Sequence, residues 1–234
     1  QRLWVVPVGS PPREGAYLNY PFDDLLRLLA LESWRHKVIV LGEDLGTVPD
    51  GLHDKLSARA ILGMRVLLFE QDNAHFKPIL QWSDQALAIT STHDLPTLAG
   101  WWSERDIDWN STLGHIDEQT ERDWRESRQR ERRGLRHALS QDSANFRNDV
   151  SESAQIIDAS VRYLGHTRAP LVLLPMEDLL GVEEQFNLPG TIDSHPNWRR
   201  RLPGDCATLL EGDDATRRLA LLAQARQEAA ERDR

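Results

Sequence analysis

The feature that most constrains this chain is a series of short apolar runs that alternate with segments of helical character. The runs lie at 38–41, 65–69, 87–90 and 169–175. They are apolar on both faces, as the buried strands of a parallel sheet are, instead of alternating between apolar and polar residues. Buried strands that are separated by helices indicate parallel βαβ units, so the sequence predicts an α/β fold.

The segments between these runs carry helix signals. Phe22, Leu25, Leu26 and Leu29 follow the i, i+3, i+4, i+7 rule of an amphipathic helix. Prolines stand at the start of three of the segments, where a helix tolerates them because the first N–H groups have no partner inside the helix. We expect helices at about 21–35, 49–59, 96–102, 150–164 and 213–234.

The stretch 114–140 is charged and bears Trp and Arg, without strand-like alternation. Together with the helical segment that follows, it predicts a helical insertion at about 114–165, whereas turn signals predict loop over 181–203. Four strands with crossover helices fit either a small open sheet or half of an eight-stranded barrel. In a parallel barrel the chemistry gathers at the carboxyl ends of the strands, so the residues that follow each strand are the candidates.

Carboxylates stand directly after two of the predicted strands. Glu43 and Asp44 follow the first strand and are framed by glycines, which let a ligand approach the backbone closely. Asp94 follows the third strand, with the imidazole of His93 beside it. A plainer interpretation stays open for both places, because a carboxylate before a helix can simply cap the first turn of that helix.

Two strand-end carboxylates in one parallel sheet fit the chemistry of glycosidic bonds. One acid protonates the leaving oxygen, and negative charge faces the oxocarbenium-like transition state; a retaining mechanism adds a carboxylate nucleophile about 5 to 5.5 Å from the acid. Aromatic rings stack on sugars, and the chain holds 8 Trp. Trp101 and Trp102 follow the His-Asp pair and either stack on sugar or pack their helix against the sheet.

The charge of the chain argues against nucleic acid as a partner. The formal net charge is −9, which does not suit a protein that wraps phosphate backbones. In the insertion, glutamates interleave with arginines, so we expect a solvated helix face there. The residues concerned are Glu121, Arg125, Glu126, Arg128, Arg130, Glu131, Arg132 and Arg133.

The cysteine content and the lengths of the apolar runs indicate where in the cell the protein works. Cys206 is the single cysteine, which excludes an internal disulfide and a cysteine-ligated zinc site and favours a reducing cytoplasmic location. The apolar runs fall far below the ~20 residues that a membrane-spanning helix needs, so we expect no membrane association. The first residue is Gln1 and not Met, and we expect the chain to begin inside a longer protein.

Four motifs carry a family resemblance. They read Glu-Gly-Ala-Tyr-Leu-Asn-Tyr-Pro at 14–21, Val-Leu-Gly-Glu-Asp-Leu-Gly-Thr-Val-Pro at 40–49, Ser-Thr-His-Asp-Leu-Pro-Thr-Leu at 91–98, and Asn-Leu-Pro-Gly-Thr at 187–191 with Asn-Trp-Arg-Arg at 197–200. With these motifs in this order over nearly its whole length, the chain resembles the 4-alpha-glucanotransferases, or amylomaltases, of glycoside hydrolase family 77. The Leu-Pro-Thr at 95–97 is similar to the bacterial maltodextrin-utilising branch.

The resemblance implies that residues 1–234 are the carboxyl-terminal half of a catalytic (β/α)8 TIM barrel, with the helical insertion at about 114–165. It implies that Glu43 is the general acid/base and that Asp94 binds sugar hydroxyls and stabilises the transition state, with His93 as a neighbouring substrate-binding residue. Asn187 either contacts sugar or serves as a turn residue. The family's nucleophile is an aspartate in an Arg-Ile-Asp-His type motif, which this sequence lacks.

The implied activity is transfer of α-1,4-glucan segments between maltodextrins by a retaining double displacement. Glu43 would protonate the leaving glucan, an aspartate outside this chain would form the glucosyl-enzyme, and Glu43 would then deprotonate the acceptor. No metal or organic cofactor is needed. The expected partners are maltodextrins and the amino-terminal half of the same enzyme, and the chain alone should be inactive. The alternative is a non-catalytic glucan-binding or interaction fragment.

Overall fold

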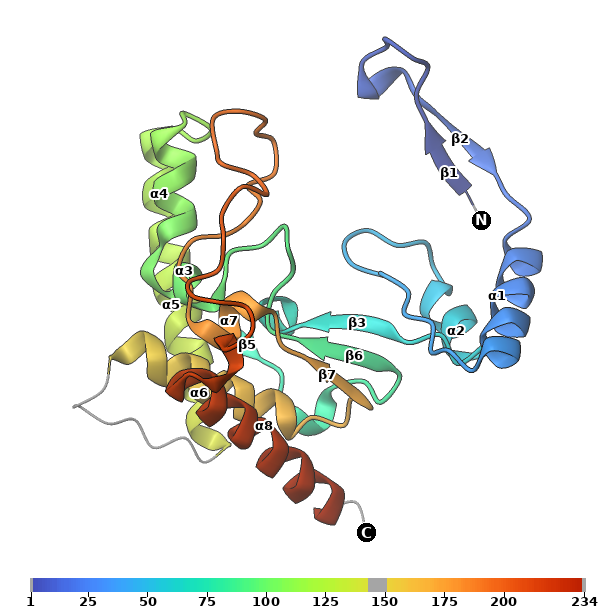
Figure 1. The fold of residues 1–234 in the computed structure, drawn as a ribbon. Coiled ribbons are helices and arrows are strands. Elements are labelled where there is room, and N and C mark those ends of the chain that lie inside the picture. The colour runs from blue at the N-terminus through green and yellow to red at the C-terminus, as the bar shows by residue number, and fades with distance from the viewer. Residues whose placement is uncertain (1, 143–150, 233–234) are drawn as a thin grey trace. The chain divides into compact units, whose positions relative to one another are not determined.

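A computed structural model describes residues 2–142 and 151–232 of the chain (Figure 1). The start of the helix predicted from 150 therefore lies outside the described residues. The chain divides into two compact units, one that ends at Met64 and one that begins at Arg65. Of the predicted helices, those near 21–35 and 213–234 are present almost as expected, as α1 (Phe22–His36) and α8 (Asp213–Arg232).

The first unit begins with a β-hairpin that the sequence analysis did not anticipate. Strands β1 (Arg2–Val5) and β2 (Ala16–Asn19) pair antiparallel, and the connection contains a 3₁₀ turn at Pro12–Glu14. Trp4 stands opposite Tyr17 with their ring centroids 4.8 Å apart, and its indole N–H donates to the Pro12 carbonyl over 3.1 Å. A Cβ at Gly15 would lie 2.5 Å from this indole, so the turn requires glycine there.

Two helices, α1 and α2 (Leu52–Ser57), follow the hairpin in the first unit. Leu26 of α1 packs with Leu56 of α2 and with Ile61 in a small core. The strand predicted at 38–41 is reduced to one parallel bridge between Leu41 and Leu62. Val38 is 52% exposed and Ile39 66% exposed, because among the described residues these two have no neighbouring strand.

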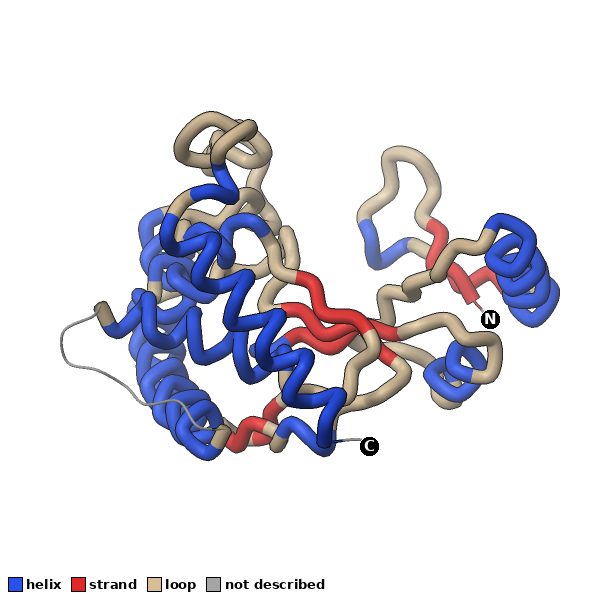
Figure 2. Tube along the Cα trace, turned by 60° about the horizontal axis from the view of Figure 1, so that its bottom comes forward, coloured by secondary structure: helices blue, strands red, loops and turns tan. Residues whose placement is uncertain are grey.

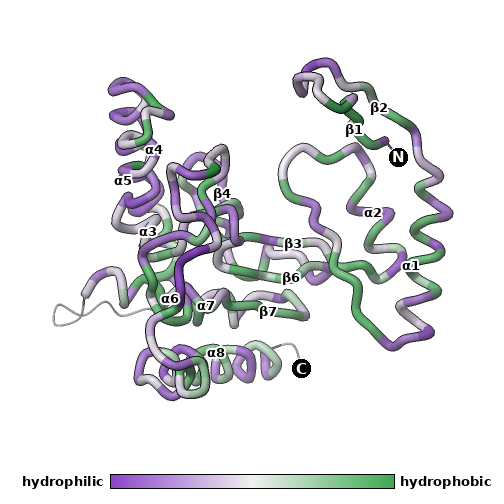
Figure 3. Tube along the Cα trace, turned by 45° about the horizontal axis from the view of Figure 1, so that its top comes forward, coloured by the Kyte–Doolittle hydropathy of each residue, from purple (hydrophilic) through white to green (hydrophobic). Residues whose placement is uncertain are grey.

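A three-stranded sheet has the order β3 (Gly63–Val66), β6 (Ala86–Ile89), β7 (Leu171–Leu173), and β3 spans the boundary at which the chain divides into units. Strands β6 and β7 are parallel, with Leu87 opposite Leu171 and Ile89 opposite Leu173. Both strands are mostly hydrophobic (Figure 3), and all four residues of β6 are buried. The mixed α/β class with parallel pairing is thus confirmed. The strand predicted at 65–69 ends early because the chain turns into a 3₁₀ helix at Leu67–Phe69.

Helices fill the connection between β6 and β7. They are α3 (Leu98–Ser103), α4 (Arg105–Thr112), α5 (Glu118–Gln141) and α6 (Glu152–Gly165), and α8 lies along α6 (Figures 1 and 2). Their shared core includes Leu98, Leu135, Ile156, Val161 and Leu164. The remaining elements are the hairpin β4 (Gln71–Asp72) and β5 (His75–Phe76), two 3₁₀ turns at Ile79–Gln81 and Leu209–Glu211, and α7 (Met176–Leu180). Residues 181–203 are loop, as predicted.

The arginines of α5 do not form one solvated face. Arg128 is buried, where it pairs with Asp106 of α4 at 2.7 Å and donates to the Trp101 carbonyl at 2.6 Å. Arg125 pairs with three carboxylates: Glu104 before α4, Asp108 of α4 and Glu121 of α5. Arg130 and Arg133 are exposed. The expectation is wrong for the buried arginine because α4 carries carboxylates that face α5. No helix within the described ranges is long and apolar enough to cross a membrane.

Candidate functional site

The loop that follows β6 carries His93 and Asp94. Both side chains are open to solvent, 58% for His93 and 51% for Asp94, and His93 Nε2 lies 3.3 Å from Asp94 Oδ2. Asp94 does not cap the next helix, because the N-cap of α3 is Thr97, whose hydroxyl accepts from the Gly100 N–H. The helix-cap interpretation of Asp94 is therefore wrong.

Asn187 reaches this carboxylate from the loop after α7. Its side-chain amide donates to Asp94 Oδ1 over 2.6 Å. Asp94 Oδ2 lies next to His93 of the same motif, so Oδ1 is the oxygen that contacts a second motif. The fold thus joins three of the four predicted site residues into one group, which we call the Asp94 cluster: His93, Asp94 and Asn187. A carboxylate, an imidazole and an amide that face solvent together form a surface with the hydrogen-bonding groups that sugar hydroxyls need.

A buried aspartate that the sequence analysis missed supports this cluster. Asp178 of α7 is fully buried and accepts hydrogen bonds from the hydroxyls of Thr90 and Ser91 and, at 2.7 Å, from the Leu98 N–H. Burial raises the pKa of Asp178, and these hydrogen bonds act against the rise. They tie the segment after β7 to both ends of the loop that carries His93 and Asp94. The strand-end rule could have found Asp178, since it follows the last predicted strand.

The loop 181–203 is held in shape by Asn197. Its Oδ1 accepts from the Leu188 N–H at 2.9 Å and lies 2.7 Å from His195 Nδ1, while its Nδ2 donates to the carbonyl and the hydroxyl of Thr191. The next residue, Trp198, has a φ of 59°, which is rare for an aromatic residue. Trp198 is 63% exposed, and its ring centroid lies 5.6 Å from that of His93.

Trp101 and Trp102 belong to the core. They are 4% and 9% exposed, and the guanidinium groups of Arg128 and Arg132 lie over their rings at 4.9 and 5.5 Å. The packing interpretation of these two residues is correct, and neither indole offers a face to a sugar.

Glu43 and Asp44 occupy opposite environments in the first unit. Glu43 is exposed. Asp44 is buried, where Oδ1 accepts from the Met64 N–H at 2.7 Å and Oδ2 lies 2.7 Å from His53 Nδ1. A Cβ at Gly63 would lie 2.5 Å from the Asp44 carboxylate, so glycine is needed beside it. Neither carboxylate caps α2, whose N-cap is Gly51 without a side-chain hydrogen bond.

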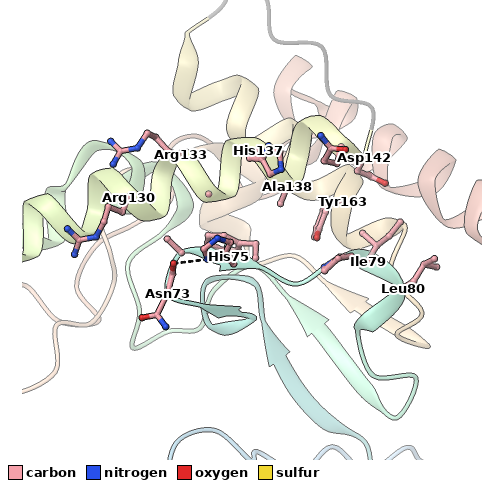
Figure 4. Close-up of a pocket in the computed structure, with 15 residues that line it drawn as sticks. Asn73, His75, Ile79, Leu80, Arg130, Arg133, His137, Ala138, Asp142 and Tyr163 are labelled. Carbon is pink, nitrogen blue, oxygen red and sulfur yellow. Dashed lines mark hydrogen bonds between the residues drawn. The ribbon is translucent and has the colours of Figure 1, made fainter.

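An apolar cavity of about 750 Å³ contains none of the predicted site residues. It lies between the β4–β5 hairpin and α5, and His75, Ile79, His137 and Tyr163 are among its lining residues (Figure 4). Asp142 is the one carboxylate among the described lining residues, so the cavity lacks the pair that glycosidic chemistry needs. In the described ranges, no group of three or more His, Cys, Asp or Glu side chains is arranged to hold a metal ion.

The motifs and the fold both have counterparts in known proteins. The chain is 33% identical to a 4-alpha-glucanotransferase of Haemophilus influenzae over 91% of its length, and 35% identical to one of Mycobacterium tuberculosis over 96%. The crystal structure of amylomaltase from Corynebacterium glutamicum superposes with a TM-score of 0.83 over 96% of the chain, at 26% identity, and the matched part is 34% of that enzyme.

The chain spans about a third of the length of these curated relatives, 31% and 32% of the two named. The sequence profile of the family described as 4-alpha-glucanotransferase, glycoside hydrolase family 77, matches residues 1–208, which include all four site residues named from the sequence. This chain belongs to the 4-alpha-glucanotransferase family.

Proposed function

We propose that the protein transfers α-1,4-glucan segments between maltodextrins by a retaining double displacement. The observation that carries the proposal is the hydrogen bond of 2.6 Å from Asn187 to Asp94, which joins two motifs that are 93 residues apart in the sequence. Because the fold brings polar motif residues together at the surface and not in the core, their contact serves a ligand better than it serves packing.

Within this proposal each member of the site has a chemical task. Asp94 grips sugar hydroxyls and stabilises the positive charge that develops on the glucose ring, and His93 and Asn187 hold its two oxygens while contacting substrate themselves. Glu43 is the acid that protonates the leaving glucan and then the base that activates the acceptor hydroxyl. The exposure of Glu43 beside the buried Asp44 supports giving this role to Glu43.

The nucleophile and the other half of the barrel would lie outside residues 1–234. The nucleophile would come from the Arg-Ile-Asp-His type motif that residues 1–234 lack. The strands β3, β6 and β7 and the bridge at Leu41 would belong to the carboxyl-terminal half of a (β/α)8 barrel, with the helices between β6 and β7 as an insertion. The exposed apolar residues at 38–41 support a missing neighbour strand.

The test compares two forms of the protein on maltotriose. The protein in its natural full length should release glucose and form longer maltodextrins, with retention of the α configuration by NMR. Residues 1–234 alone should form neither product. Binding of maltodextrin by the full-length protein without any product would instead favour the non-catalytic glucan-binding fragment, and strong activity of residues 1–234 alone would contradict the place proposed for the nucleophile.

A further inference from the structure

We propose that Trp198 is a glucan-stacking residue, whose exposed indole forms a sugar subsite beside the Asp94 cluster. This inference rests on the proposed function, because it names a contact of the same site. Sugars present two chemistries to a protein: hydroxyls at the ring edge, which need hydrogen-bonding partners, and C–H faces, which an aromatic ring can cover. The Asp94 cluster supplies the first kind of contact and lacks the second.

Among the described tryptophans of the second unit, Trp198 is the most exposed, ahead of Trp124 at 42%. Tryptophan is highly buried on average, and Trp82, Trp101 and Trp102 follow that rule at 9% exposure or less. Trp198 is 63% exposed, so the folded chain leaves most of a large apolar face in water. A sugar that covered this face would remove apolar surface from water, which is favourable, whereas folding leaves that surface exposed.

The backbone conformation at Trp198 is strained. The φ of 59° is a conformation that L residues with large side chains rarely adopt, and glycine would meet no such penalty. The conformation persists because Asn197 pins the loop through four hydrogen bonds and the Trp198 N–H donates to the Phe186 carbonyl at 3.0 Å. Strain that the surrounding structure maintains is typical of functional positions.

The position of the ring fits a subsite next to the reacting sugar. His93 neighbours both the indole and the carboxylate: its ring is 5.6 Å from that of Trp198, and its Nε2 is 3.3 Å from Asp94 Oδ2. The indole and the Asp94 carboxylate therefore share one neighbour, the imidazole of His93. A glucose unit bound at Asp94 would leave the adjacent unit of the same chain over or beside the indole.

The experiment replaces the ring without disturbing the loop. Trp198→Gly suits the positive φ and removes only the indole, whereas Trp198→Phe keeps an aromatic face. Trp124→Ala is the matched control, since Trp124 is an exposed tryptophan of the same unit on α5. For each variant of the natural full-length protein, kcat and KM for maltotriose are measured, together with retardation in native gels that contain amylose. Thermal unfolding verifies that each variant is folded.

We expect Trp198→Gly to raise KM about fivefold to tenfold with a smaller change in kcat, Trp198→Phe to lie between, and the control to match the wild type. Retardation by amylose should weaken in the same order. Unchanged KM and retardation in Trp198→Gly would overturn the inference, and so would a loss confined to kcat, which would mean that the ring only positions His93.

The wild type separates this inference from the proposed function. If it is retarded by amylose but forms no product, the proposed transfer is wrong, while weaker retardation of Trp198→Gly would still support the stacking residue. If the wild type transfers glucan and Trp198→Gly is as active and as strongly retarded, the proposed function stands and the stacking residue does not. If the wild type is neither active nor retarded, both are wrong.

Discussion

At the residue scale, the neighbours Glu43 and Asp44 differ in what surrounds them. The Asp44 carboxylate is occupied by the Met64 N–H and by His53, and it lies against Gly63, so its contacts hold the first unit together. Glu43 is exposed and is free to meet a substrate. A single charged dipeptide thus divides into a residue that supports the fold and a residue that the proposed mechanism uses.

This division predicts opposite effects of two substitutions. Glu43→Gln should lower kcat by about two to four orders of magnitude, as expected when a general acid is lost, without changing the unfolding midpoint. Asp44→Ala should destabilise the protein by about 1–3 kcal/mol, because the partly buried Met64 N–H loses its acceptor. Asp50→Ala, at an exposed carboxylate of the same loop, is the control. Wild-type turnover in Glu43→Gln would remove Glu43 from the acid role.

A second residue prediction concerns Asp94. Its carboxylate should interact more strongly with the substrate as positive charge develops on the ring, which is differential binding of the transition state. Asp94→Asn should therefore lower kcat far more than it raises KM for maltotriose. Steady-state kinetics of the natural full-length protein measure both constants, and a variant in which KM alone changes would contradict the assignment.

At the scale of elements, Asp178 couples α7 to the loop after β6 and to the start of α3. The three donors that converge on it come from Thr90, Ser91 and Leu98, which border the segment with His93 and Asp94. The Asp94 cluster is therefore positioned by one buried carboxylate that does not itself face solvent. A second buried contact acts on helices: the two ring nitrogens of His166 lie 2.6 Å from Asp142 and 2.8 Å from Glu228, which links α8 to the end of α5.

The raised pKa of Asp178 predicts how stability depends on pH. A group whose pKa is higher in the folded than in the unfolded state stabilises fully below its unfolded value, near 3.8, and that stabilisation is lost as pH rises through the folded value. The contribution of Asp178 to the free energy of unfolding should thus fall as pH rises above about 4, and Asp178→Asn should remove that contribution from the pH dependence.

Urea unfolding of the wild type and of Asp178→Asn at several pH values between about 4 and 7 measures the difference. Asp84→Asn, at an exposed carboxylate of the same unit, should keep the wild-type slope. Parallel pH dependence in the wild type and Asp178→Asn would show that burial does not raise the pKa of Asp178.

At the scale of the whole molecule, the first unit exposes an unusual amount of apolar surface. Leu26 is the buried residue of α1, and most of the other leucines of that helix face solvent. The hairpin β1–β2 is exposed along both strands. The exposed apolar residues of these elements are Leu3, Trp4, Val5, Tyr17, Leu18, Leu25, Leu28, Leu29, Leu31 and Trp34.

Apolar surface of this kind marks an interface or promotes aggregation. We expect residues 1–234, purified alone, to self-associate and to enhance the fluorescence of a hydrophobic dye. Light scattering after size-exclusion chromatography measures the association, and replacing Leu28 and Trp34 by Glu and Arg should reduce it. A monodisperse monomer that does not enhance dye fluorescence would show that this surface is stable in water.

The predicted elements differ in how well local sequence determined them. Two helices lie within a few residues of their predicted bounds: α1, which has clear apolar spacing, and α8, which is rich in Ala and Arg. Helical hydrogen bonds are local, so local sequence is enough to place such helices. The run at 38–41 has strand character but forms one bridge, because a strand requires a partner that the local sequence does not supply. The hairpin β1–β2 was missed because its strands are exposed and short, although Gly15 and the two aromatic rings opposite each other stabilise it.

The sequence by itself determined the α/β class and the loop over 181–203, since these follow from residue type and spacing along the chain. It also named Glu43, His93 and Asp94 as candidates at predicted strand ends, and Asn187 through the resemblance of its motif to a family. Only the tertiary structure decided that Asn187 donates to Asp94, that Asp178 anchors their loops, and that Trp101 and Trp102 are buried while Trp198 is exposed. Burial and contact between distant residues depend on how elements pack, which the order of residues in a single segment does not specify.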